Sequence, residues 1–359
     1  MPGNRKIRVL IVDDSAIVRK VLTEALSAEP DIEVAGTAPD PYIASDKILA
    51  LEPDVLTLDI EMPRMDGLTF LKRLMQFRPM PAIIISSLAQ SSCRAAVQAM
   101  EWGALEVLAK PGGPYSVGEL RRTLAQKVRA AACARLRPRA AAEEIAVPGP
   151  VWQPHAAPAE TVLAIGASTG GTEAIAAIVS RLPATCPGVV IAQHIPPQFS
   201  RAFANRLNSI SALKVKEAED NDTLQPGVAL VAPGDFHMLL RKTGGRFRVI
   251  VKPGPKVCYQ RPSVDVLFSS VAEASGARAV AALLTGMGSD GAQGLLRMRQ
   301  AGAHTIAQDE STCVVYGMPR EAVAIGAVSQ VLPLPAIGPA LLTAAADRAL
   351  RPSAALAAR

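Results

Sequence analysis

The chain has 359 residues, with 29 prolines and 26 glycines, and at this length two domains are more common than one. Hydrophobic residues make up 49% of it and charged residues 19%, which supplies apolar side chains for full cores and excludes wholesale disorder. The net charge of +6 mildly favours acidic partners, but 38 basic against 32 acidic residues do not form the basic stripe typical of nucleic-acid binding.

The N-terminal part of the chain alternates strand and helix patterns. Buried strands are predicted at 7–14, 32–38, 54–60, 81–87 and 104–110, and helices at 15–30, 41–53, 67–77, 92–103 and 118–136. Apolar strands that alternate with helices predict a parallel sheet that is covered on both faces. We therefore expect a doubly wound, flavodoxin-like domain over residues 5–124.

Alanine and proline dominate the segment that follows, which lacks any sustained periodicity. Residues 125–159 are interpreted as the end of a helix and a linker that its prolines partly stiffen. Ile145 and Trp152 are candidates to anchor this linker on a domain surface, and a fully solvated tether is the alternative. Residues 351–359 are predicted to be a frayed tail.

A second α/β pattern occupies residues 160–350. After the opening run TVLAIGASTGG, strands are predicted at 188–195, 227–233, 246–252, 279–286 and 303–308, with helices at 172–182, 263–276 and 291–302. The pattern predicts a mostly parallel α/β domain with Rossmann-like topology.

Polar side chains cluster where the strands of the first domain end, which is where open parallel sheets bind ligands. Asp13 and Asp14 follow the first strand, Asp59 ends the third, and Ser86 and Lys110 end the next two. Converging carboxylates repel one another unless a cation binds, and oxygen ligands at an open site suit Mg²⁺. Each aspartate taken alone is better explained as a helix or turn cap, and the argument for a cation site rests on the set.

The segment GASTGG, residues 166–171, lies between a predicted strand and a predicted helix. One interpretation is a dinucleotide-binding turn, although Ser168 stands where that fingerprint requires glycine. Another is a G-x-S-x-G turn that exposes a nucleophilic serine beside backbone N–H groups. A third is a tight turn in which Ser168 caps the helix.

The sequence contains four histidines that differ in their placement. His194 follows the apolar run VVIA and is the best-placed general base for Ser168, with a hydrogen-bonded turn histidine as the alternative. His237 lies at a turn that enters a strand, where either substrate contact or a structural role is open. His304 precedes a strand, and His155 lies in the linker.

The acid that would orient such a base should also follow a strand. Asp290 does so, in the glycine-rich segment LLTGMGSDG, and Asp309 is its rival. The order Ser, His, Asp differs from that of α/β-hydrolases, but a triad is defined by geometry rather than by chain order.

Roughly the first third of the chain resembles the receiver domain of two-component response regulators. The resemblance rests on VDDS, LDIEMPRMDG, IIISS and LAKP. It implies Asp59 as the phosphorylated residue, Mg²⁺ held by Asp13, Asp14, Asp59 and the backbone carbonyl of Glu61, and phosphoryl contacts from Ser86 and Lys110. The implied phosphoryl donor is a sensor histidine kinase.

Most of the second domain resembles the protein-glutamate methylesterases of bacterial chemotaxis, the CheB family. GASTGG, AQHIP, APGDFHM, RPSVDVLF, LLTGMGSDGAQGL and AQDESTCVVYGMP carry this resemblance. It implies a serine ester hydrolase with Ser168 as nucleophile, His194 as base and Asp290 as its partner. The N–H groups of Thr169 and Met287 are the implied oxyanion donors, and the ester chemistry needs no metal.

The implied function is hydrolysis of methyl esters on glutamates of chemoreceptor cytoplasmic helices, with release of methanol, in sensory adaptation. Deamidation of specific receptor glutamines is implied as well. The alternative is a chemotaxis-like pathway outside motility with the same esterase chemistry. A response regulator with a DNA-binding output and a nicotinamide-dependent enzyme are the rivals from other classes.

Compartment is predicted from cysteine usage and hydropathy. The cysteines are scattered and odd in number, without a C-x-x-C pair: Cys93, Cys133, Cys186, Cys258 and Cys313. This pattern favours a reducing cytoplasm over a disulfide framework or a zinc cage. No apolar run approaches the ~18 residues of a membrane helix, so we expect a cytoplasmic protein that is not embedded in a membrane.

Overall fold

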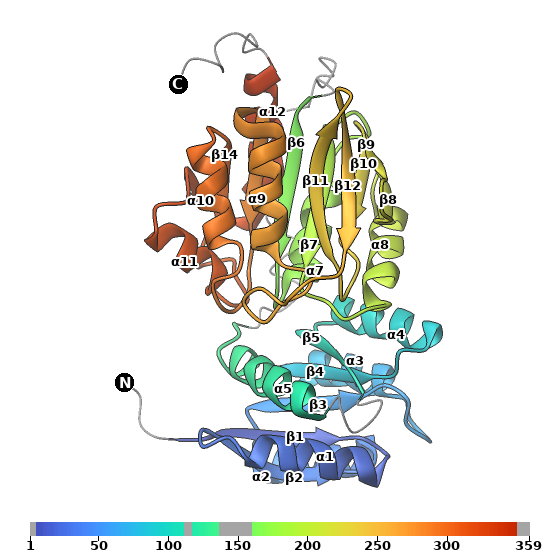
Figure 1. Ribbon diagram of the computed structural model, residues 1–359. Helices are drawn as coiled ribbons and strands as arrows, with labels where there is room; N and C mark the ends of the chain where they lie inside the picture. Colours follow the sequence, from blue (N-terminus) through green and yellow to red (C-terminus); the bar gives the residue numbers. More distant parts are fainter. Residues whose placement is uncertain (1–4, 111–116, 136–159, 350–359) are drawn as a thin grey trace. The chain divides into compact units, whose positions relative to one another are not determined.

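The computed structural model describes residues 5–110, 117–135 and 160–349. The chain divides into two compact units, Met1–Pro138 and Arg139–Arg359, which occupy the blue-to-teal and green-to-red parts of Figure 1. The predicted linker anchors Ile145 and Trp152 and the tail 351–359 lie outside the described residues. No helix within the described ranges is long and apolar enough to cross a bilayer.

The first unit is a five-stranded parallel sheet with helices between its strands, in the order β2-β1-β3-β4-β5. Its elements are β1 (Ile7–Val12), α1 (Ala16–Ser27), β2 (Ile32–Ala38), α2 (Pro41–Leu51), β3 (Val55–Asp59), α3 (Gly67–Phe77), β4 (Ala82–Ser86), α4 (Gln90–Glu101), β5 (Glu106–Ala109) and α5 (Val117–Ala132). This is the doubly wound arrangement that the sequence predicts.

Side-chain caps fix where the helices of this unit begin. The Ser15 hydroxyl accepts a hydrogen bond from the N–H of Val18 at the start of α1. Asp40 and Asp66 cap α2 and α3 in the same manner. Because α1 and α2 start within four residues of the carboxyl ends of β1 and β2, and α3 follows β3 after a short loop, the polar residues there are held at one edge of the sheet.

The second unit contains a seven-stranded parallel sheet, β15-β14-β13-β6-β7-β10-β8, and a three-stranded antiparallel sheet, β11-β12-β9. Its elements are β6 (Val162–Ala167), α7 (Gly171–Val179), β7 (Gly188–Gln193), α8 (Phe199–Ile210), β8 (Lys214–Glu217), β9 (Thr223–Leu224), β10 (Val228–Val231), β11 (His237–Thr243), β12 (Arg246–Lys252), α9 (Val264–Ser275), β13 (Ala279–Leu283), α10 (Ala292–Gln300), β14 (His304–Gln308), α11 (Met318–Ala324), β15 (Gln330–Leu332) and α12 (Leu334–Ala349). The predicted pair of α/β domains is confirmed.

The order of the parallel strands places a switch point beside β6. The chain enters the sheet at β6, fills one side through β7, β8 and β10, and then returns to the other side of β6 with β13, β14 and β15. Loops after β6 and β13 therefore leave the sheet in different directions, and such a divergence is where open α/β sheets bind ligands.

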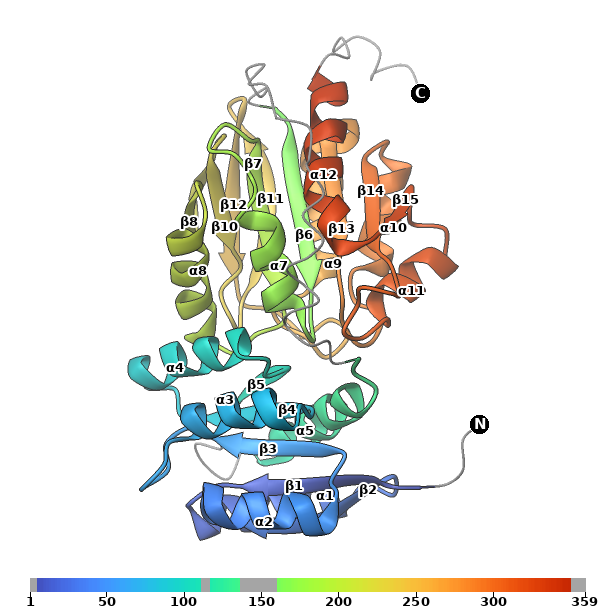
Figure 2. The same cartoon turned by 180° about the vertical axis from the view of Figure 1, so that it is seen from behind.

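Two layers cover this sheet. The helices α9 and α10 and the β11–β12 hairpin lie on one face (Figure 1), and α7 and α12 lie on the other (Figure 2). The run 246–252, predicted as a strand, pairs antiparallel with β11 outside the main sheet. Phe247 and Val249 of β12 are buried in a core shared with Phe268 of α9, so the alternate residues of β12 face away from that core.

Candidate active site and phosphoryl-acceptor site

Ser168 lies on the sharp turn between β6 and α7. Gly170 has φ of 74°, and a Cβ there would come within 2.6 Å of the Val314 side chain. A Cβ on Gly171 would come within 2.2 Å of the Gln193 side-chain oxygen. The glycines of GASTGG are thus needed for a tight strand–turn–helix, and Ser168, 6% exposed, is held at its apex.

His194 follows β7, the strand next to β6, and its backbone N–H donates to the carbonyl of Ala167 at 3.1 Å. Its Nε2 lies 2.7 Å from Oδ2 of Asp290, and both side chains are 2% exposed. Nδ1 is buried and makes no hydrogen bond to any residue that the structure describes. With Nε2 donating to the carboxylate, Nδ1 of the neutral ring is the nitrogen available as a proton acceptor.

Asp290 is held by the N-terminus of α9, which lies across the loop from it. Oδ2 accepts the N–H of Val264 at 2.8 Å, and Oδ1 accepts the hydroxyl of Ser263 at 2.8 Å and the N–H of Asp265 at 3.1 Å. Burial by itself raises the pKa of Asp290, but the hydrogen bonds from His194, Ser263 and Val264 outweigh it and hold the pKa below its ordinary value. Asp290 is therefore a charged partner for the imidazole.

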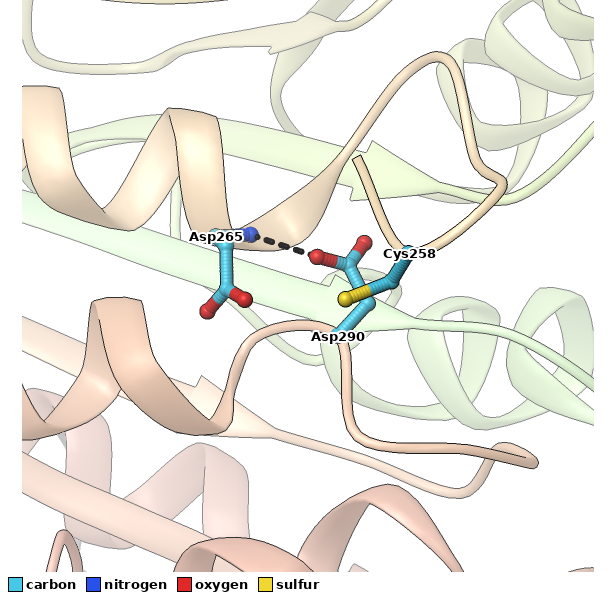
Figure 3. Close-up of side chains that lie close together, drawn as sticks. All are labelled: Cys258, Asp265 and Asp290. Atoms are coloured by element: carbon cyan, nitrogen blue, oxygen red, sulfur yellow. Dashed lines mark hydrogen bonds between the residues drawn. The ribbon is translucent and has the colours of Figure 1, made fainter. Parts of the chain in front are cut away.

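Two further polar side chains lie close to Asp290, and neither was predicted as a site residue (Figure 3). The thiol of Cys258 and the carboxylate of Asp265 each have an atom within 4.8 Å of the Asp290 carboxylate. Burial, together with the charge of Asp290, raises the pKa of Asp265 to about 6, although the N–H of Gly294 donates to it at 2.6 Å. Asp265 ends the motif RPSVD, and this motif was the feature of the sequence that could have pointed to it.

The loop after β13 closes over the serine turn. The N–H of Ser168 donates to the carbonyl of Thr285 at 3.0 Å, and the hydroxyl of Thr285 donates to the carbonyl of Thr169, also at 3.0 Å. A Cβ on Gly286 would come within 2.7 Å of Cβ of Ser168. The N–H of Met287 makes no hydrogen bond within the described parts of the chain. The structure thus brings the segments of both predicted oxyanion donors to Ser168.

The other candidates from the sequence lie outside this cluster. His237 is buried and accepts a hydrogen bond from the N–H of Ser263 at 3.3 Å, so it supports the residue that binds Asp290. His304 contacts a glutamine of the neighbouring strand β15. Asp309 accepts a hydrogen bond from the N–H of Thr312 in the turn that follows it. His155 lies outside the described residues.

In the first unit, Asp13, Asp59 and Lys110 meet at the carboxyl edge of the sheet. Nζ of Lys110 lies 2.7 Å from Oδ2 of Asp59 and 3.3 Å from Oδ2 of Asp13. Asp59 is fully buried and Asp13 is 1% exposed. Burial is the main cause that raises the pKa of Asp59 to about 6 and the pKa of Asp13 above its ordinary value, because one lysine does not fully offset it.

The polar atoms around Asp59 have few partners. Within the described residues, the buried hydroxyl of Ser86 makes no hydrogen bond, and Lys110 is the single partner of the buried Oδ2 of Asp13. Asp13, Asp14 and Asp59 each offer an oxygen within 4.8 Å of the others, and the N–H of Glu61 donates to Asp59 at 3.2 Å. A cluster of carboxylate oxygens that is short of donors fits a hard cation such as Mg²⁺.

Comparison with known proteins places both units. The CheB methylesterase family matches residues 163–341, and the response regulator receiver domain matches residues 9–121. The protein-glutamate methylesterase/protein-glutamine glutaminase 2 of Syntrophus aciditrophicus (strain SB) is 56% identical over 335 residues, 92% of this chain and 97% of that one. The chain belongs to the CheB methylesterase family.

Two more relatives agree with this assignment. The protein-glutamate methylesterase/protein-glutamine glutaminase of Salmonella typhimurium (strain LT2) is 49% identical over 339 residues, 94% of this chain and 96% of that one. The crystal structure of the Thermotoga maritima CheB methylesterase catalytic domain has a TM-score of 0.50 at 38% identity and covers 51% of this chain and 97% of that one. The resemblance that the motifs indicate is confirmed, whereas the roles of single residues stay predictions.

Proposed function

We propose that this chain hydrolyses γ-methyl esters of glutamates on the cytoplasmic helices of methyl-accepting chemoreceptors, and that it deamidates specific receptor glutamines at the same site. The observation that carries the proposal is the buried pair of His194 and Asp290 beside the Ser168 turn. Nδ1 of His194 is the ring nitrogen left without a partner. The names of the close relatives support the same substrate class.

In the proposed reaction, the Ser168 hydroxyl attacks the ester carbonyl while Nδ1 of His194 takes its proton. Asp290 holds the ring through Nε2 and stabilises the imidazolium that forms. The N–H groups of Thr169 and Met287 stabilise the oxyanion. Methanol, or ammonia from an amide, leaves with the proton from His194, and water then releases the acyl group. Hydrogen bonds between a nucleophile and its base often form fully only when substrate binds. A hydrogen bond between the Ser168 hydroxyl and His194 is therefore expected in the substrate complex.

The first unit is proposed to regulate this activity by phosphorylation of Asp59, with a chemotaxis sensor histidine kinase as the donor. The side chains of Asp13, Asp14 and Asp59 and the carbonyl of Glu61 would hold Mg²⁺, which when bound neutralises charge around the transferring phosphoryl group. Lys110 and the unpartnered hydroxyl of Ser86 would bind the phosphoryl oxygens. The chain would act in the cytoplasm, in sensory adaptation.

Mass spectrometry of a methylated receptor fragment tests the proposal directly. The full-length protein should remove one methyl group from each reactive glutamate and release an equal amount of methanol, and Ser168→Ala should do neither. Conversion of particular glutamines to glutamates in the same spectra would identify the deamidase activity. Intact methyl esters after incubation with folded, phosphorylated protein would refute the assignment of substrate.

A further inference from the structure

Three arginines share the outer face of the β11–β12 hairpin. Arg241 lies directly opposite Arg248 in the antiparallel register, and Arg246 lies two residues before Arg248 on the same strand. With Asp220 and Asn221 they line a cavity of about 780 Å³. We call Arg241, Arg246 and Arg248 the arginine face.

The arginine face has no ion pair with any residue in the described ranges. The Arg246 side chain makes no hydrogen bond there either, while Arg241 donates to the Thr243 hydroxyl at 3.2 Å and Arg248 to a backbone carbonyl at 3.3 Å. By contrast, Arg206 in the same unit makes a two-pronged ion pair with Glu173. The guanidinium groups of the arginine face therefore keep most of their donors available.

The three arginines repel one another, and the register of the hairpin keeps them together. Like charges directly opposite one another on a sheet are destabilising. A shift of register would bury the arginines, because Phe247 and Val249 on the same strand fill the core on its other face. The hairpin thus holds three cations together on one surface, and an anionic ligand would offset their repulsion.

The lining favours carboxylates over densely charged phosphates. Guanidinium groups bind carboxylates in a planar, two-pronged geometry. Asp220 lies in the same lining, and it repels a doubly charged phosphate more strongly than a singly charged carboxylate. The side-chain amide of Asn221 can donate hydrogen bonds to peptide groups or accept them. The cavity is also larger than one carboxylate needs. We propose that the arginine face binds an acidic segment of another polypeptide through its glutamate or aspartate side chains.

This surface is separate from the proposed catalytic cluster. β11 begins at His237, which supports Ser263 near Asp290, and the arginines lie toward the other end of the strand. At ~3.4 Å per residue, the level of Arg241 and Arg248 is about 14 Å from His237 and the level of Arg246 about 20 Å. In Figure 1 the turn of the hairpin lies at the opposite end of the unit from the carboxyl ends of β6 and β7. The inference therefore goes beyond the proposed function, and its test needs no ester substrate.

Fluorescence anisotropy with the full-length protein tests it. The probe is a short labelled peptide that alternates glutamate with glycine, and a peptide with glutamine in place of glutamate is the control ligand. Arg246→Gln should weaken binding of the glutamate peptide about three- to tenfold, since an exposed charge-assisted contact contributes modestly. Replacement of all three arginines by glutamine should abolish specific binding.

The matched control is Arg181→Gln, which removes one charge from another exposed arginine of the same unit. It should leave the affinity for the glutamate peptide unchanged, and thermal unfolding of every variant should show that the fold is intact. Equal weakening by Arg181→Gln and Arg246→Gln, or equal binding of both peptides, would overturn the proposal. Tighter binding of a DNA duplex than of the peptide, dependent on the same three arginines, would overturn it in favour of a nucleic-acid surface.

Discussion

Asp290 and Asp59 are both buried aspartates at the carboxyl ends of parallel strands, yet their surroundings oppose each other. Asp290 receives hydrogen bonds from His194, Ser263 and backbone N–H groups, and its pKa is lowered. Asp59 shares one lysine with Asp13, and its pKa is raised to about 6. The first carboxylate is charged and oriented by the chain alone, whereas the second has few donors of its own and would be completed by the cation and the phosphoryl group of the proposed function.

The largest expected effect is on the site that is already complete. Ser168→Ala should lower ester hydrolysis by roughly 10⁶-fold, because loss of the nucleophile removes the whole triad pathway. Methanol release from a methylated receptor fragment measures this. The variant should still accept a phosphoryl group at Asp59, and a loss of both activities would indicate misfolding instead.

Asp290→Asn tests whether the charge of this carboxylate matters beyond its shape. The amide keeps the size of the side chain but lacks the charge that stabilises a protonated His194, so turnover should fall by roughly 10³–10⁴-fold. A combined His194→Ala and Asp290→Asn variant should be little slower than His194→Ala alone, since triad members act as a unit. Losses that multiply in the combined variant would argue against a shared mechanism.

The site around Asp59 should respond to a phosphoryl group and a cation, whereas the His194–Asp290 pair needs neither. A small-molecule phosphodonor with Mg²⁺ should raise esterase activity of the full chain by about 5–150-fold, the usual range for coupling between two sites. Asp59→Asn should block this increase without changing the basal rate.

Removal of residues 1–150 should raise the basal rate if the first unit inhibits the second. Comparison of methanol release by this fragment and by the unphosphorylated full chain checks the point. A fragment that is no faster would exclude inhibition, and phosphorylation would then have to stimulate directly or promote docking to the receptor.

The smallest effect concerns Asp265, the carboxyl beside Asp290 whose pKa is raised from 3.8 to about 6. The folded state binds this proton more tightly than the unfolded state does, so the free energy of unfolding falls as pH rises from about 4 to 6. Asp265→Asn removes this penalty and should stabilise the protein by about 1–2 kcal/mol above pH 6.5, less than two full pKa units would give because the group is only partly buried. Denaturant unfolding at several pH values measures the difference, and an advantage that did not shrink toward pH 4 would contradict the assigned pKa.

Much of both sites could be predicted because strand ends are readable from the sequence. Apolar runs that end in Asp13, Asp59, Ser86 and Lys110 place these residues at one edge of a parallel sheet, and the structure brings them together there. Ser168 and His194 follow neighbouring strands for the same reason. Periodicity alone did not choose between Asp290 and Asp309, since both follow strands. The family resemblance pointed to Asp290, and in the structure its carboxylate lies 2.7 Å from Nε2 of His194.

Features that depend on tertiary packing were not predictable. The run 246–252 has a strand pattern and follows Gly244 and Gly245, a two-residue hairpin signal, but nothing local shows that the hairpin lies in a sheet separate from the main one. The ring nitrogen of His194 that binds Asp290 depends on how α9 packs against the loop after β13. Asp265 belongs to a recognised motif, but its pKa is raised only because the fold buries it and places the charge of Asp290 beside it.

The hydrogen bond from Thr285 to Thr169 joins residues that are 116 positions apart in the chain. During synthesis the serine turn therefore leaves the ribosome long before the loop that closes over it, and before Asp290 is made. Contacts of such sequence separation form late, because the intervening chain must be ordered first. A nascent or prematurely terminated chain would carry the serine without its partners, so hydrolytic activity would begin only when β13 has paired with β6 and synthesis of the unit is nearly finished.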